Sequence, residues 1–105
     1  MGLAVFWCDD TGAWLDHEGD IGGVFARAIL NAQESGRTDL PVMCSIDVYG
    51  DTTVIPPRTD TLADEIAIVR DETSDASARI ELGKILRLAR AASSRPGSYL
   101  DCAGD

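Results

Sequence analysis

The pattern of apolar and polar positions at the start of the chain predicts a β-hairpin. Residues 3–7 (Leu-Ala-Val-Phe-Trp) form a short apolar run that is typical of a strand. Residues 9–12 (Asp-Asp-Thr-Gly) have the composition of a turn. Residues 13–15 can therefore return as the second strand of the hairpin.

A helix is predicted next, because apolar residues recur at intervals of three and four from Ile21 onward. Asp20 stands in the position of an N-cap, and Gly36 in that of a glycine that ends a helix. Gly22 and Gly23 each weaken a first helical turn by about 1 kcal/mol relative to alanine. Either these glycines allow close packing, or the helix starts one turn later.

The middle of the chain predicts two more strands. Apolar and polar residues alternate with a period of two over residues 40–49. A Gly-Asp turn follows, and residues 52–55 can pair back as another strand. Pro56 and Pro57 end it, since proline cannot donate to a strand ladder.

Two helical segments are predicted after the prolines. Residues 61–64 (Thr-Leu-Ala-Asp) resemble a capping box and predict a helix start. Ser74 and Asp75 indicate a break and a fresh N-cap, although a single long helix is the alternative. The last helix ends before Pro96, and we expect residues 98–105 to be a flexible tail.

These elements give the order ββαββαα in a single domain over residues 1–97, a size that suits one domain. The expected fold class is α+β, a small antiparallel sheet with helices packed on one face. No apolar run is long enough to span a bilayer, and the N-terminus lacks a signal-peptide pattern. We therefore expect a cytoplasmic protein, in a reducing compartment.

The formal net charge of −9 changes the picture of possible partners. Nucleic acid and anionic membranes are both bound through Lys and Arg, so neither is expected. The charge favours a basic partner protein, or serves solubility alone. It is also segregated, because no Lys or Arg precedes Arg27, whereas residues 79–95 carry five against Glu81. That basic segment can pair with acids of the same chain or of a second copy in a homodimer.

No motif for catalysis, metal binding or a cofactor stands out. His17 is the one histidine, and the acids around it lack the spacing of a calcium loop or a zinc site. Cys8 precedes two aspartates, whose charge disfavours a reactive thiolate. Cys44 fits a buried strand position, and Cys102 lies in the expected tail. We therefore expect a binding protein rather than an enzyme, with no catalytic residue, metal or cofactor.

Three aromatic residues, Trp7, Trp14 and Tyr49, are candidates for an interface. Trp and Tyr are favoured as interface anchors, but they also fill protein cores. We expect Trp7 to lie in the core, and Trp14 fits either place.

One further set of residues lies within the first 72 positions and combines a strand opening, a glycine before a proline-containing strand entry, and an apolar helix face. Its members are Met1, Gly2, Leu3, Gly36, Leu40, Pro41, Val42, Met43, Val48, Tyr49, Gly50, Leu62, Ala63, Glu65 and Ile68. This layout is similar to that of small immunity proteins of bacterial polymorphic toxin systems. The resemblance implies an inhibitor that binds and blocks a cognate toxin.

Our hypothesis from the sequence is an acidic protein-binding module, an immunity or inhibitor protein that blocks a basic toxin or nuclease. A self-associating structural or accessory protein is one alternative, and a phage-encoded inhibitor that mimics nucleic acid is another. The expected partner-binding residues are Asp9, Asp10, Trp14, Asp16, Glu18, Asp20, Asp47 and Asp51.

Overall fold

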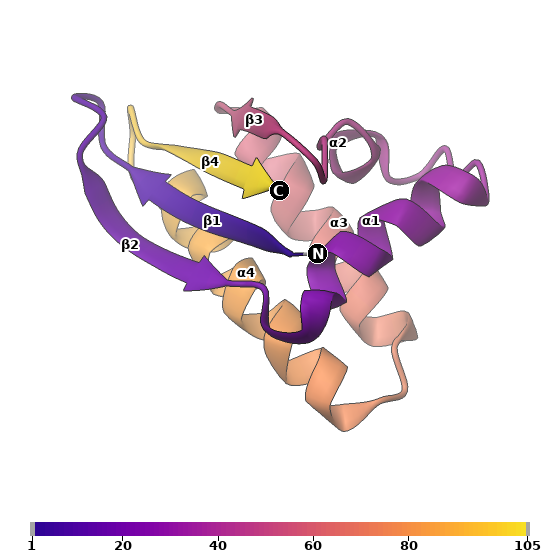
Figure 1. Cartoon of the computed structure of the whole chain (residues 1–105). Coiled ribbons are helices and arrows are strands. Elements are labelled where there is room, and N and C mark those ends of the chain that lie inside the picture. Colours follow the sequence, from indigo (N-terminus) through magenta and orange to yellow (C-terminus); the bar gives the residue numbers. More distant parts are fainter. Residues whose placement is uncertain (1, 105) are drawn as a thin grey trace.

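The computed structural model describes residues 2–104 as one antiparallel sheet with helices packed on one face (Figure 1). The strands are β1 (Leu3–Cys8), β2 (Trp14–Gly19), β3 (Asp51–Val54) and β4 (Tyr99–Gly104), in the spatial order β2-β1-β4-β3. The predicted α+β class, the N-terminal hairpin and the strand before the prolines are confirmed.

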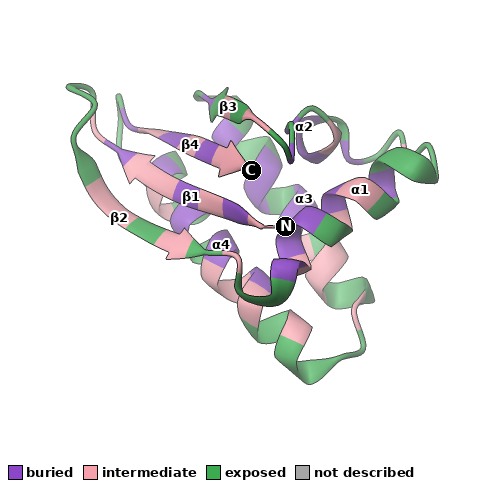
Figure 2. Ribbon diagram, viewed as in Figure 1, coloured by how far each residue is buried: buried purple, intermediate pink, exposed green. Residues whose placement is uncertain are grey.

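The helices are α1 (Val24–Glu34), the one-turn α2 (Pro41–Cys44), α3 (Arg58–Glu72) and α4 (Ala76–Ser94), with a 3-10 turn η1 (Ile21–Gly23) before α1. In Figure 1, α4 crosses behind the sheet, where it contacts β1, β2 and β4, and α3 packs along α4. Figure 2 shows the buried positions on β1 and β4 and on the helices. Their apolar side chains form one core cluster between the sheet and the helices.

The start of α1 explains the two glycines. Gly22 and Gly23 have φ angles of 72° and 67°, a left-handed conformation that side chains with a Cβ rarely adopt. This path brings the Asp20 carboxylate back over the helix, where it accepts hydrogen bonds from the amides of Phe25 (2.8 Å) and Ala26 (2.9 Å). The helix therefore starts one turn later than Ile21, and Asp20 caps it from further upstream than an ordinary N-cap.

The end of α1 follows the sequence prediction. Gly36 has a φ of 67°, and its amide donates to the carbonyl of Gln33. The next amide, of Arg37, donates to the carbonyl of Ala32. These two bonds form a Schellman motif, in which glycine at this position relieves the strain of the left-handed turn.

The strand predicted over residues 40–49 is wrong, because α2 and a set of turns replace it. The alternation marks buried positions correctly, because Leu40, Val42, Ile46 and Val48 are buried, but Met43 from the other parity is buried as well. Pro41 occupies the first position of α2, where the missing amide hydrogen costs nothing. The period of two therefore reports which positions are buried, but it does not establish that the segment pairs as a strand.

A buried carboxylate from another helix caps α2. Glu65 of α3 is 2% exposed, and it accepts hydrogen bonds from the amides of Val42 (3.2 Å) and Met43 (2.8 Å). These amides belong to the first turn of α2 and have no partner within the helix. Since Leu40, at the N-cap position, supplies no side-chain acceptor, Glu65 performs that role over a sequence distance that pattern analysis does not detect.

The flexible tail predicted for residues 98–105 is also wrong over residues 98–104, and residue 105 lies outside the described residues. Tyr99–Gly104 is strand β4, which lies between β1 and β3 and pairs with both. Leu100 and Cys102 alternate into the core, at 0% and 1% exposure. Because β3 pairs with β4 rather than with residues 40–49, the sequence order ββαββαα does not describe the sheet.

The helix after the prolines starts at Arg58, before the capping box predicted at residues 61–64. The break predicted at Ser74 and Asp75 is confirmed, so α3 and α4 are separate helices. Asp75 is the N-cap of α4, and its carboxylate accepts a hydrogen bond from the amide of Ala78 at 2.8 Å.

The thiol of Cys102 gives a direct test of β4. Burial raises the pKa of this thiol to about 12, with a further contribution from the neighbouring charge of Asp101. We expect Cys102 to resist alkylation by iodoacetamide at neutral pH in the folded protein and to react fully in denaturant. The readout is mass spectrometry of tryptic peptide 91–105, which contains Cys102 alone among the cysteines. Fast labelling in the native state, as a flexible tail would give, contradicts this strand.

Glu65→Ala tests the cap of α2. The substitution leaves two buried amides without an acceptor, at a cost of about 1–3 kcal/mol for each. We expect a matching fall in the free energy of unfolding, measured by urea denaturation. Asp64→Ala is the control, because Asp64 is the exposed neighbour on the same helix. Equal stability of the two variants would show that the cap contributes nothing.

Candidate functional site

The sheet face turned away from the helices carries the most distinctive surface of the molecule. Along β1, Leu3 and Val5 are buried against the helices, whereas Phe6 lies on the opposite face. The strand register places His17, Phe6, Asp101 and Thr53 side by side, one from each strand. No helix covers this row of residues 17, 6, 101 and 53 in the part of the chain that the structure describes (Figure 1).

A hollow of about 350 Å³ lies beside this row. The residues that line it are Phe6, Trp14, Asp51, Thr53, Asp101, Cys102 and Ala103. Ala103 and Asp51 belong to the next row on the same face, in which they pair with each other. The walls of the hollow combine two aromatic rings with two carboxylates, a mixture suited to an amphipathic side chain.

Trp14 forms the aromatic wall of the hollow. It opens β2 next to an irregularity in the β1–β2 pairing, between Trp7 and Cys8. Its side chain is 68% exposed, and its ring lies 4.4 Å from that of Phe6, centroid to centroid. His17, also on β2, stacks on the Phe6 ring with 5.8 Å between the ring centroids. By contrast, Trp7 packs against the core as expected.

Asp101 and Asp51 make the hollow negative. The Thr53 hydroxyl donates a hydrogen bond of 2.7 Å to one oxygen of Asp101 and so orients that carboxylate. Among residues 2–104, no Lys or Arg makes an ion pair with Asp51 or Asp101. The negative field reaches neighbouring groups: after burial, the charge of Asp101 is the next cause that raises the pKa of the Cys8 thiol. The two carboxylates therefore have charge available for a cation from outside the chain.

Three of the acids predicted to bind a partner have a local structural role. Asp9 accepts hydrogen bonds from the Thr11 amide, the Thr11 hydroxyl and the Ala13 amide within the hairpin turn. These bonds, the hydroxyl first, hold the pKa of Asp9 below its usual range. Asp20 caps α1, as described above, and Asp47 accepts from the amide of Tyr49 at 2.9 Å. Their positions in the sequence are explained by turns and caps.

Two more predicted acids are paired within the chain, on the helix side of the sheet. Arg87 of α4 reaches Asp16 and Glu18 of β2, with N–O distances of 3.1 Å to each. The resulting hydrogen bonds, that to Glu18 first, raise the pKa of Arg87. The pairing of the basic segment with acids of the same chain is thus realised here, and these two carboxylates lie on the face opposite the hollow.

The predicted site is therefore only partly assembled. Trp14 and Asp51 lie at the hollow, while Asp10 is exposed at the tip of the hairpin turn. Phe6, Thr53 and Asp101 belong to the hollow but were not predicted. The alternation of Leu100 and Cys102 with Asp101 and Ala103 is the sequence signal for this strand, and the expectation of a flexible tail over residues 98–105 does not use it.

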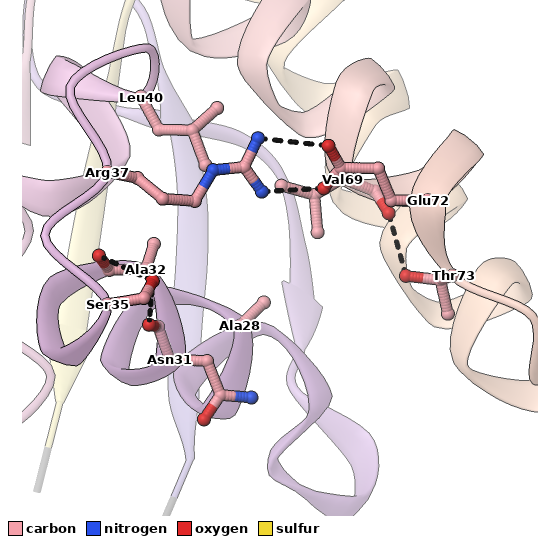
Figure 3. A pocket seen from close by; sticks show the side chains of 9 residues that line it. All are labelled: Ala28, Asn31, Ala32, Ser35, Arg37, Leu40, Val69, Glu72 and Thr73. Atoms are coloured by element: carbon pink, nitrogen blue, oxygen red, sulfur yellow. Dashed lines mark hydrogen bonds and ion pairs between the residues drawn. The ribbon is translucent and has the colours of Figure 1, made fainter.

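A second hollow, of about 270 Å³, lies between the end of α1 and the end of α3 (Figure 3). Arg37 dominates it, and the guanidinium lies 2.6 Å from Glu72 and 2.7 Å from Asp39. These partners, Asp39 first, hold the pKa of Arg37 above its usual range. With its single cation paired to two carboxylates, this hollow offers no free charge to a ligand, and the arrangement fastens the α1–α2 loop to α3.

The structure offers little for chemistry at His17 or the cysteines. Within residues 2–104, no group of three His, Cys, Asp or Glu side chains is placed to hold a metal ion. Cys8 and Cys102 are buried, and burial is the main cause that raises the pKa of each thiol, which disfavours the reactive thiolate. The expectation of a binding protein rather than an enzyme stays a prediction.

Arg87→Gln tests the intramolecular charge pairing. The pKa of Asp16 is lowered first by the hydrogen bond from the His17 amide and then by Arg87. We expect the variant to move this pKa part of the way back up, as followed by NMR titration, with Arg90→Gln as the control on the same helix. Because the folded-state pKa is depressed, the contribution to stability is present above the ordinary value of about 3.9 and is lost as the pH falls through the lowered value. An unchanged titration curve for Asp16 would contradict the pairing.

Comparisons with known proteins leave the family open. No family model, curated protein or solved structure matches this chain. None of the helices in residues 2–104 has the length and apolar character needed to cross a membrane.

Proposed function

We propose that this chain is a protein-binding module that engages a basic protein through the uncovered face of its sheet. The observation that carries the proposal is the hollow on that face, with Trp14 exposed at its wall and Asp51 and Asp101 unpaired by any described cation. Interfaces depend on a few anchor residues, among which tryptophan is enriched. The net charge of −9 adds steering toward a cationic surface.

Within this class, we favour an immunity or inhibitor protein that blocks a basic toxin or nuclease. A nuclease needs a positive surface to hold nucleic acid, and an acidic protein can occupy that surface in its place. The resemblance noted from the sequence points in the same direction. The proposal places the protein with its target in the cytoplasm and requires neither nucleic acid, membrane nor cofactor.

Self-association is the second candidate. Arg90 and Arg95, at the C-terminal end of α4, are exposed and make no ion pair with an acid among the described residues. They could meet the acidic hollow of a second copy. Light scattering over a concentration series separates the candidates, since a homodimer gains mass with concentration and a module for a foreign partner stays monomeric.

Capture of the partner tests the proposed function. The tagged protein is incubated with lysate of its native cells at low and high salt, and bound proteins are identified by mass spectrometry. We expect one basic protein, retained at low salt and weakened at high salt. Trp14→Ala should reduce its affinity by about 2 kcal/mol or more, roughly thirty-fold, as for an interface anchor.

Ile80→Ala is the matched control, because Ile80 is also an exposed large apolar residue (61%) but lies on α4. If the captured protein binds the Trp14 and Ile80 variants equally well, the uncovered face is not the interface. Capture of an acidic protein whose binding is insensitive to salt would reject the electrostatic basis of the proposal.

A further inference from the structure

The hollow on the sheet face has the geometry of a subsite for one side chain rather than a flat patch. It is bounded by the Trp14 and Phe6 rings on one side and by Asp101, Thr53 and Asp51 on the other. Its volume of about 350 Å³ accommodates one long side chain. The two aromatic rings and the two carboxylates thus line the same small hollow.

The aromatic wall and the acidic wall are together complementary to a cation with flat, apolar faces. A cation over the face of Trp is attracted by the ring quadrupole. The exposed indole of Trp14 is held by its packing on Phe6, at 4.4 Å between centroids, and therefore requires little ordering on binding. Arginine is favoured over lysine here, because its planar guanidinium stacks on aromatic faces while its edge donates to carboxylates.

The carboxylate arrangement supplies the acceptors for that edge. Thr53 donates to one oxygen of Asp101, at 2.7 Å, so the carboxylate is oriented, and its other oxygen accepts no side-chain hydrogen bond within residues 2–104. Asp51 lies one row away on β3, paired with Ala103. Since no described Lys or Arg pairs with either acid, an incoming guanidinium displaces no internal ion pair.

We infer that this hollow is an arginine-binding subsite, in which a single arginine of the basic partner stacks on Trp14 and donates hydrogen bonds to Asp101, with Asp51 adding to the negative potential. The inference rests on the proposed function and names the chemical group that the face recognises. Lysine is the weaker ligand of this subsite, because an ammonium group lacks the flat faces and the paired donors.

The test uses the full chain and short blocked peptides. Acetyl-Gly-Arg-Gly-amide is titrated into the protein, and ¹H–¹⁵N NMR spectra follow the Trp14 indole N–H and the amides of residues 99–103. The citrulline peptide is the control, since it has nearly the same shape without the charge, and the lysine peptide measures the preference for a guanidinium. We expect saturable shifts at the hollow with the arginine peptide, weaker ones with lysine and none with citrulline.

Variants then locate the site. Asp101→Asn should weaken the arginine peptide by about tenfold, because a hydrogen bond to a charged group is lost while the amide oxygen can still accept from Thr53. Asp60→Asn is the control, an exposed acid in the first turn of α3. Unchanged affinity in Asp101→Asn, equal shifts with citrulline, or shifts spread over exposed acids elsewhere would each overturn the subsite. Shifts of Trp14 with protein concentration alone, abolished by Arg90→Gln, would assign the occupant to a second copy and overturn it as well.

Failure of this subsite is distinguishable from failure of the proposed function. If binding of the captured basic protein depends on Trp14 but the arginine peptide does not bind, the proposed interface is supported and the arginine assignment is rejected. If the arginine peptide binds but Trp14→Ala leaves the capture of the partner unchanged, the subsite is supported and the function proposed for the face is rejected.

Discussion

Strand β4 pairs on both sides, with β1 from Leu3 to Cys8 and with β3 from Asp51 to Val54, and the rest of the sheet depends on this placement. Without β4, β3 has no neighbour and the sheet is reduced to a hairpin, which is marginal by itself in water. The end of β4 is fixed as well. Gly104 donates a hydrogen bond to the Gly50 carbonyl at 2.7 Å, and a Cβ on this glycine would clash with the Val48 carbonyl. The candidate site follows from the same pairing, because β4 carries Asp101 to a position between Phe6 and Thr53.

The elements that could be predicted from the sequence are those set by local chemistry. The turn after β1, the glycine that ends α1 and the cap at Asp75 each depend on residues within a few positions of one another. The misassigned segments depend on distant ones. Residues 40–49 form α2 and a set of turns, with α2 capped by Glu65, and β4 is a strand only because β1 and β3 flank it. The period of two in residues 40–49 and the polar composition of residues 98–105 carry no information about the distant residues that these segments contact.

The acidic residues of the chain show why the number of acids in a sequence overestimates the size of an acidic interface. Asp9, Asp20, Asp47 and Glu65 accept hydrogen bonds from backbone amides, so each carboxylate serves a turn or a helix end. Asp16 and Glu18 neutralise Arg87, on the helix side of the sheet. The run of acids before Arg27 therefore does not form one surface, although it looks continuous in the sequence. Trp14 and Asp51 could be predicted as site residues, but their association with Asp101 required the strand order.

The division of charge between the two faces of the sheet also bears on how a partner can bind. The edge strand β2 carries Asp16, His17 and Glu18, and charged residues on an edge disfavour the addition of a further strand. Strand addition at β2 is therefore disfavoured, and the proposed contact uses the side chains on the uncovered face instead. On that face, the aromatic cluster of Phe6 and Trp14 offers apolar area while the unpaired carboxylates beside it oppose burial against another apolar or acidic surface. The proposed partner, which brings positive charge together with flat apolar surface, would satisfy both conditions, and the same carboxylates would disfavour nonspecific association through the exposed tryptophan.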